Sequence, residues 1–133
     1  MIVRLTAWTN RRLERLFERY NEKFWDGRLN KIKILVADLA SDSRERIAGR
    51  FSLLPIDEAK ILVDPAACGS DLEVRRTLLH EMCHLALCCM DDDHGPVFLS
   101  ELKRIWSRGA PIPIRSEALR TIGQRIPSAE EVY

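Results

Sequence analysis

Three histidines and one glutamate are the residues of this chain whose types and spacing could carry out chemistry. His80 and His84 stand at the two ends of the motif His-Glu-Met-Cys-His, and Glu81 follows the first histidine. Residues four apart lie on one face of a helix, so both imidazoles can direct a nitrogen at one ion about 2.0–2.1 Å away, as zinc requires. Glu81 is offset around the helix and can reach a water molecule whose pKa zinc lowers toward about 7. The motif therefore predicts a zinc-dependent hydrolytic centre with Glu81 as the general base.

A catalytic zinc ion needs a third protein ligand, and His94 is the one histidine left in the chain. The helix is expected to run about 7.5 Å beyond His84, and the loop that follows can span up to about 16 Å on its way back. We therefore expect His80, His84 and His94 to bind Zn²⁺. Two alternatives for the third ligand stay open, namely one carboxylate of the run Asp91, Asp92, Asp93, and Glu101 farther along the chain.

The histidine motif lies in a segment with strong helix signals. Ser70 and Glu73 match the capping-box pattern S-x-x-E, and apolar residues then recur at helical spacing to about residue 89. Residues 90–93 are expected to form a polar loop. Pro96, which follows Gly95, predicts the start of a second helix, and Gly109 stands just past its end.

The remaining elements predict a small α+β fold. Residues 10–25 form an amphipathic helix, and Asp26 and Gly27 form the turn that ends it. Strand-like runs follow at residues 31–39, 46–53 and 59–63. Their short connections predict a mostly antiparallel three-stranded sheet. We expect one domain over residues 1–109, and a tail over 110–133 that forms no separate domain and holds at most a short helix at 117–122.

Composition agrees with one globular domain of an intracellular protein. The chain has 133 residues, of which 46% are hydrophobic and 31% charged, and its net charge of +1 gives no general preference for anionic partners. It has neither an apolar run of about 20 residues nor a signal-peptide pattern, so we expect a cytoplasmic protein without membrane contact. Its four cysteines contain no C-x-x-C pair and are interpreted as buried, reduced thiols: Cys68, Cys83, Cys88 and Cys89.

The two histidine segments together resemble the SprT-like, Spartan-related family of zinc metallopeptidases. The resemblance rests on residues 80–84 and on the segment His94-Gly95-Pro96-Val97-Phe98. Residues 20–29, 48–51 and 61–63 support it, and it covers about residues 10–106. It implies a compact zincin-like domain with the sheet packed on the zinc helix, Glu81 as catalytic acid and base, and His80, His84 and His94 as metal ligands.

The resemblance also implies a function, namely hydrolysis of protein or peptide substrates, including proteins bound or crosslinked to DNA. Residues 107–133 contain no Cys or His, so the zinc ribbon of many bacterial relatives is not encoded. Two other functions stay open: a zinc-stabilised protein- or DNA-binding module with little turnover, and a zinc hydrolase for a non-peptide amide. Because Glu81 is not needed to bind metal, its presence favours the peptidase.

Three further groups of residues have side chains that could serve roles beside the metal site. Three residues are candidates to stabilise the oxyanion of the reaction: Tyr20, Arg50 and Tyr133. For DNA, the arginines at 11, 12, 15 and 19 and those at 44, 46 and 50 are candidates, although interleaved acidic residues make the first group resemble a solvated helix face. The tryptophans lie in apolar patterns and are interpreted as core residues rather than base-stacking platforms: Trp8, Trp25 and Trp106.

Overall fold

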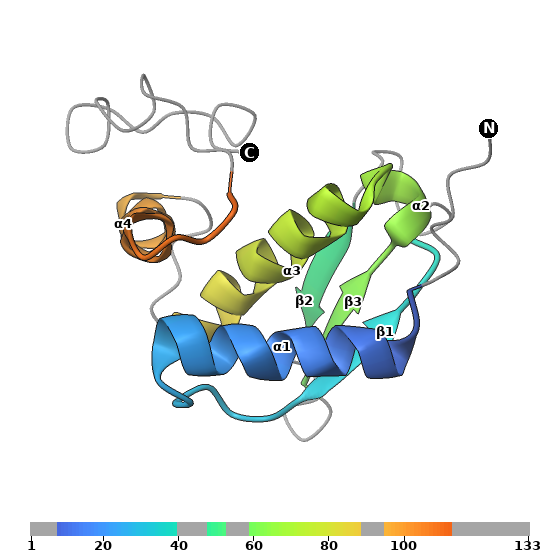
Figure 1. The fold of residues 1–133 in the computed structure, drawn as a ribbon, viewed down its shortest axis with the longest axis horizontal. Coiled ribbons are helices and arrows are strands. Elements are labelled where there is room, and N and C mark those ends of the chain that lie inside the picture. Colours follow the sequence, from blue (N-terminus) through green and yellow to red (C-terminus); the bar gives the residue numbers. More distant parts are fainter. Residues whose placement is uncertain (1–7, 40–47, 53–58, 89–94, 113–133) are drawn as a thin grey trace.

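The computed structural model describes residues 8–39, 48–52, 59–88 and 95–112, and it confirms the α+β class with the N-terminal helix first (Figure 1). The described strands form one small sheet, and helices precede and follow it. The elements, in chain order, are α1 Asn10–Trp25, β1 Lys33–Val36, β2 Gly49–Ser52, β3 Lys60–Val63, α2 Pro65–Cys68, α3 Asp71–Ala86 and α4 Pro96–Ser107.

The sheet is mixed, which corrects the expectation of mostly antiparallel pairing. Its order is β1-β3-β2, with β2 antiparallel to β3 and β1 parallel to β3. The last of the described strands, β3, takes the centre, and its inward residues, Ile61 and Val63, are fully buried there. Ile61 lies between Ile34 and Phe51 in register, so one apolar row crosses all three strands.

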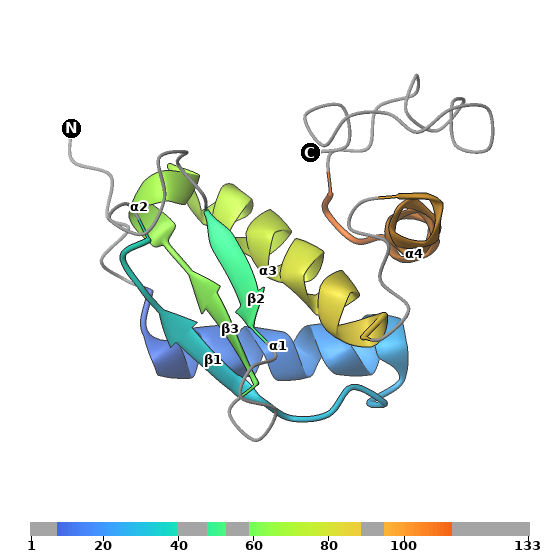
Figure 2. The ribbon, with the colours of Figure 1, turned by 180° about the vertical axis from the view of Figure 1, so that it is seen from behind.

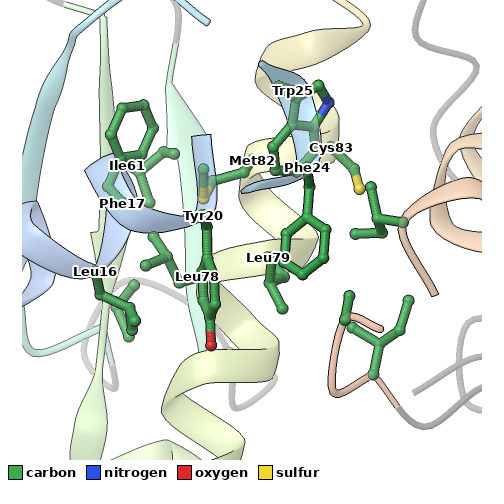
Figure 3. Close-up of a cluster of buried hydrophobic side chains, with 14 of the residues drawn as sticks. Leu16, Phe17, Tyr20, Phe24, Trp25, Ile61, Leu78, Leu79, Met82 and Cys83 are labelled. Atoms are coloured by element: carbon green, nitrogen blue, oxygen red, sulfur yellow. The ribbon is translucent and has the colours of Figure 1, made fainter. Parts of the chain in front are cut away.

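Helices α1 and α3 cover the same face of the sheet, and Figure 2 shows the sheet from its other side. The amphipathic pattern of α1 accounts for its packing, because its apolar residues recur at helical spacing and are all buried. Figure 3 shows aromatic rings of α1 packed against aliphatic side chains of α3. The labelled members of this core are Leu16, Phe17, Tyr20, Phe24, Trp25, Ile61, Leu78, Leu79, Met82 and Cys83.

The helix ends lie where the local chemistry predicts them. Ser70 caps α3, its hydroxyl oxygen accepting a hydrogen bond from the Glu73 N–H at 3.1 Å. Pro96 occupies the first turn of α4, and Gly109 follows its end with φ 99°. Asp26 ends α1 in the left-handed region with φ 54°. These caps fix the ends of the helices that bear the histidine motif and its neighbours.

Some expectations differ from the structure or lie outside its described part. Strands β1 and β3 are shorter than the runs expected to form them. Asp64, expected only to close a strand, caps the short helix α2 by accepting hydrogen bonds from two backbone N–H groups. Helix α3 ends at Ala86, earlier than residue 89. The described residues do not include 89–94 or 113–133. The loop expected at 90–93 and the helix expected at 117–122 therefore remain predictions. No described helix is long and apolar enough to cross a membrane.

Candidate metal centre

Helix α3 carries the histidine motif through the middle of the fold. Its residues from Leu78 to Cys83 are all buried, including His80 and Glu81 with 5% and 6% exposure. A helix buried on every side must be enclosed by other elements, and α3 contacts α1, the sheet and α4. The enclosure gives polar side chains in this stretch a fixed and largely dry environment, which suits a catalytic site better than a solvated helix face.

The two imidazoles of α3 stand side by side with their Nε2 atoms 3.3 Å apart. The ring centroids are 4.9 Å apart and the ring planes nearly perpendicular, at 79°. Two nitrogens bound to one tetrahedral ion at about 2.0–2.1 Å lie about 3.3–3.4 Å from each other. The His80–His84 pair therefore has the spacing of one edge of a tetrahedral zinc site. Without an ion, the same distance lets one ring donate a hydrogen bond to the other.

Glu81 lies beside this pair and against strand β2. Its Oε2 is 3.9 Å from Nε2 of His80, so the carboxylate borders the nitrogens that would bind metal. A Cβ added at Gly49 would lie 3.2 Å from both Cγ and Oε2 of Glu81, and only 2.6 Å from Cγ2 of Thr77 one turn earlier. The strand backbone can approach the helix this closely because residue 49 has no side chain. Glu81 is thereby confined between β2 and the imidazoles.

Phe98 forms a wall of the site that sequence reasoning did not assign. Its side chain is fully buried on the first turns of α4. The ring stacks on His84 with centroids 4.4 Å apart and meets His80 edge-on at 4.8 Å. The segment that resembles the family includes Phe98, but helical spacing alone predicts a core residue there, and the contact with both histidines depends on how α4 packs.

The third metal ligand remains a prediction. His94 and the run of Asp91, Asp92 and Asp93 lie outside the described residues. Within the described part of the chain, no three His, Cys, Asp or Glu side chains gather around one point.

The alternative ligand Glu101 is engaged elsewhere. Its Oε2 accepts hydrogen bonds from Nε1 of Trp25 at 2.7 Å and from Arg104 at 3.0 Å, and its Oε1 accepts another from Arg104 at 2.9 Å. Burial raises the pKa of this carboxyl, but the hydrogen bonds from Arg104 and Trp25 outweigh it and hold the pKa below its ordinary value. The contacts describe a carboxylate that joins α4 to α1, which argues against Glu101 as the third ligand. His94 and the alternative run of aspartates at 91–93 remain untested.

The candidates for oxyanion stabilisation have different environments. Tyr20 is a core residue whose ring lies 5.7 Å from that of Phe24, and burial raises the pKa of its hydroxyl. In Figure 3 its hydroxyl points away from Met82 and Cys83, toward the N-terminal half of α3. Arg50 is half-buried on β2, next to Gly49, and Tyr133 lies outside the described residues. Gly49 and Phe51 face the helices, so the alternation of β2 directs the Arg50 side chain to the other face of the sheet, away from Glu81.

The tryptophans are not equivalent. Trp8 and Trp25 are buried as expected and donate hydrogen bonds to Asp71 and Glu101, each at 2.7 Å. Trp106 is 38% exposed, which corrects its assignment to the core. Trp106 lies on the same face of α4 as the buried residues Leu99 and Leu102, but it stands in the last turn of the helix, where its side chain is partly exposed. Arg12 packs over the ring of Trp8 with its guanidinium carbon 3.7 Å from the centroid, so this arginine is partly committed within the fold.

The described cysteines are free thiols, with Cys83 buried and Cys68 and Cys88 half-buried. Burial raises the pKa of Cys68, whose Sγ donates to Oγ1 of Thr77 at 3.5 Å. A raised pKa disfavours the reactive thiolate. The interpretation as reduced thiols therefore fits Cys68, while Cys89 lies outside the described residues.

Comparison with models of known protein families gives a match for this chain. The model of the SprT-like family matches residues 13–117, which is most of the chain and includes all of α3 and α4. The chain therefore belongs to the SprT-like family. No curated protein and no solved structure matches it.

Proposed function

We propose that this chain is a zinc-dependent metallopeptidase that hydrolyses protein substrates. The observation that carries the proposal is the pair of Nε2 atoms 3.3 Å apart on His80 and His84, with the Glu81 carboxylate 3.9 Å from the first. Membership of the SprT-like family supports it. His80, His84 and His94 would hold Zn²⁺, which would supply Lewis acidity to polarise a peptide carbonyl and make a water molecule more acidic.

Glu81 performs the proton transfers in this proposal. Its carboxylate accepts a proton from the water molecule as the water oxygen bonds to the peptide carbon. It then delivers that proton to the peptide nitrogen as the carbon–nitrogen bond breaks. The close approach of Gly49 on one side and the imidazoles on the other keep the carboxylate in position for both steps.

Strand β2 supplies a place for an extended substrate. It is an outer strand of the described sheet, because it pairs with β3 alone among the described strands. Main-chain groups on the other edge of such a strand can pair with an added peptide. Because Gly49 of β2 lies against Glu81, a peptide on that edge would pass the general base. We infer that substrates bind in extended form, which favours unfolded or locally unfolded proteins, including proteins attached to DNA.

The test compares wild-type protein with E81Q and a control, E73Q, which makes the same chemical change on α3 away from the imidazoles. Each protein is assayed for zinc content and for cleavage of casein and histone, with and without single-stranded DNA and a chelator. We expect zinc-dependent cleavage by wild type and E73Q, and turnover about 10²–10⁴-fold lower in E81Q with its zinc retained.

Cleavage by E81Q at the wild-type rate would refute the assigned base. Zinc-loaded wild type that cleaves neither protein under any condition would instead favour a zinc-stabilised binding module. Cleavage only with single-stranded DNA present would support DNA as a partner.

A further inference from the structure

The contact between Phe98 and the two histidines suggests a role beyond filling space. The ring is stacked on His84 at an interplanar angle of 29° and meets His80 at 63°. One aromatic side chain therefore bounds both imidazoles on the side that faces α4. The two imidazoles also contact each other, so each ring is held by two neighbours.

Helix α4 holds Phe98 firmly in this position. Leu99, Leu102 and Ile105 anchor the helix in the core. The hydrogen bond from Trp25 to Glu101 ties it to α1, and at the start of the helix the Leu99 N–H donates to the Gly95 carbonyl at 3.0 Å. The position of the ring is thus set by the packing of α4 and α1, independently of any metal.

An imidazole without such a wall rotates broadly about its χ2 bond, and a metal that binds it must stop this rotation. We propose that Phe98 is a positioning residue that holds the His80 and His84 rings in their metal-binding orientation and thereby raises the affinity of the site for zinc. This inference rests on the proposed function, because it assumes that the pair binds zinc. Residues that orient metal ligands from outside typically contribute about 10–100-fold in affinity.

The test replaces Phe98 with leucine, which keeps an apolar side chain but removes the flat ring. The matched control is I105A, which removes buried apolar volume from the same face of α4, two turns from Phe98 and about 10 Å along the helix. Zinc affinity of the metal-free proteins is measured by competition with a chelating indicator. The absorption spectrum with Co²⁺ reports the geometry of the site, and melting temperatures of the metal-free proteins report the fold.

We expect F98L to bind zinc about 10–100-fold more weakly than wild type, with an altered Co²⁺ spectrum. We expect I105A to lower the melting temperature but to bind zinc within about threefold of wild type. Unchanged affinity in F98L overturns the inference, and so does an equal loss in I105A, which would mean that α4 acts only through general stability. Wild type without zinc affinity overturns both the proposed function and this inference, whereas tight wild-type binding with unchanged F98L overturns this inference alone.

Discussion

Gly49 offers a sharp test of how the general base is positioned. A Cβ at this residue would lie 2.6 Å from Cγ2 of Thr77 and 3.2 Å from Cγ and Oε2 of Glu81. The backbone of Gly49 is not in the left-handed region, so alanine is allowed there by its own conformation. Any effect of G49A must therefore come from the close approach of β2 to α3.

The size of the effect follows from these distances. Carbon atoms in contact normally lie about 3.5–4.0 Å apart, so the added methyl overlaps the Thr77 methyl by about 1 Å. Overpacking of this kind costs about 1–3 kcal/mol in the free energy of unfolding. Relief requires β2 and α3 to separate, which moves the Glu81 carboxylate, and a displacement approaching 1 Å can lower turnover by up to about 10²-fold. His80 and His84 lie on the side toward Phe98, so zinc affinity should change little.

The assay is a double-mutant cycle between G49A and T77S. T77S removes the methyl that causes the worst overlap but keeps Oγ1, which accepts the hydrogen bond from Cys68. Stability is measured by denaturant unfolding, and turnover by proteolysis with zinc-saturated protein. We expect T77S to recover at least about 1 kcal/mol of the stability lost in G49A. Turnover should recover only in part in the double mutant, because the overlap with Thr77 is gone but the 3.2 Å contacts with Glu81 remain.

Three results would refute this reasoning. G49A could be as stable and as active as wild type, which would mean that the approach of β2 is not tight. The two substitutions could show no coupling, which would place the strain elsewhere. G49A could lose zinc together with activity, which would show that the strand supports the metal ligands rather than the base.

Three other predictions concern stability. Burial raises the pKa of Glu101, but hydrogen bonds from Arg104 and Trp25 bring it below the ordinary value of 4.5. The ionised carboxylate therefore stabilises the fold above pH 4.5, and this stabilisation is lost as the pH falls through the folded-state pKa. The difference in unfolding free energy between metal-free wild type and E101Q should therefore be constant near neutral pH and shrink below pH 4.5, and a difference that grows there would contradict the assignment. S70A should lose about 1 kcal/mol of unfolding free energy in chemical denaturation, since it removes the cap of α3, and an unchanged midpoint would argue against the cap. Zinc at about 1,000 times its dissociation constant should raise the unfolding free energy of wild type by about 4 kcal/mol, and that of H80A far less. Melting temperatures measured over a zinc titration test this, and equal increases in the two proteins would show that His80 is not a zinc ligand.

Local signals in the sequence predicted the three longer described helices well, although not the short α2. The spacing of apolar residues over 10–25 coincides with α1, and the Ser70 cap and Pro96 mark where α3 and α4 begin. These signals act within a few residues of the chain, so no knowledge of the tertiary structure is needed to interpret them. The facing imidazoles of His80 and His84 follow from the same local geometry.

Features that depend on packing between distant segments could not be predicted in the same way. The parallel pairing of β1 with β3 is not encoded in either strand, because both have the same sequence, Lys-Ile-Leu-Val. The close approach of Gly49 to Glu81 and the contact of Phe98 with both imidazoles arise only when the sheet and α4 pack on α3. For Trp106 the local pattern was misleading. Its helical spacing from other apolar residues of α4 suggests burial, but it lies in the last turn of the helix and its side chain is partly exposed.

The most direct test of the account is the zinc stoichiometry of purified, metal-depleted and reloaded protein, measured by mass spectrometry of the metal for wild type, H84A and H94A. The account predicts one tightly bound zinc ion per wild-type chain and loss of tight binding in each variant, with all three metal-free proteins folded by circular dichroism. Wild type that takes up no zinc, or H84A that keeps a full equivalent, would contradict the claim that these imidazoles form a metal centre.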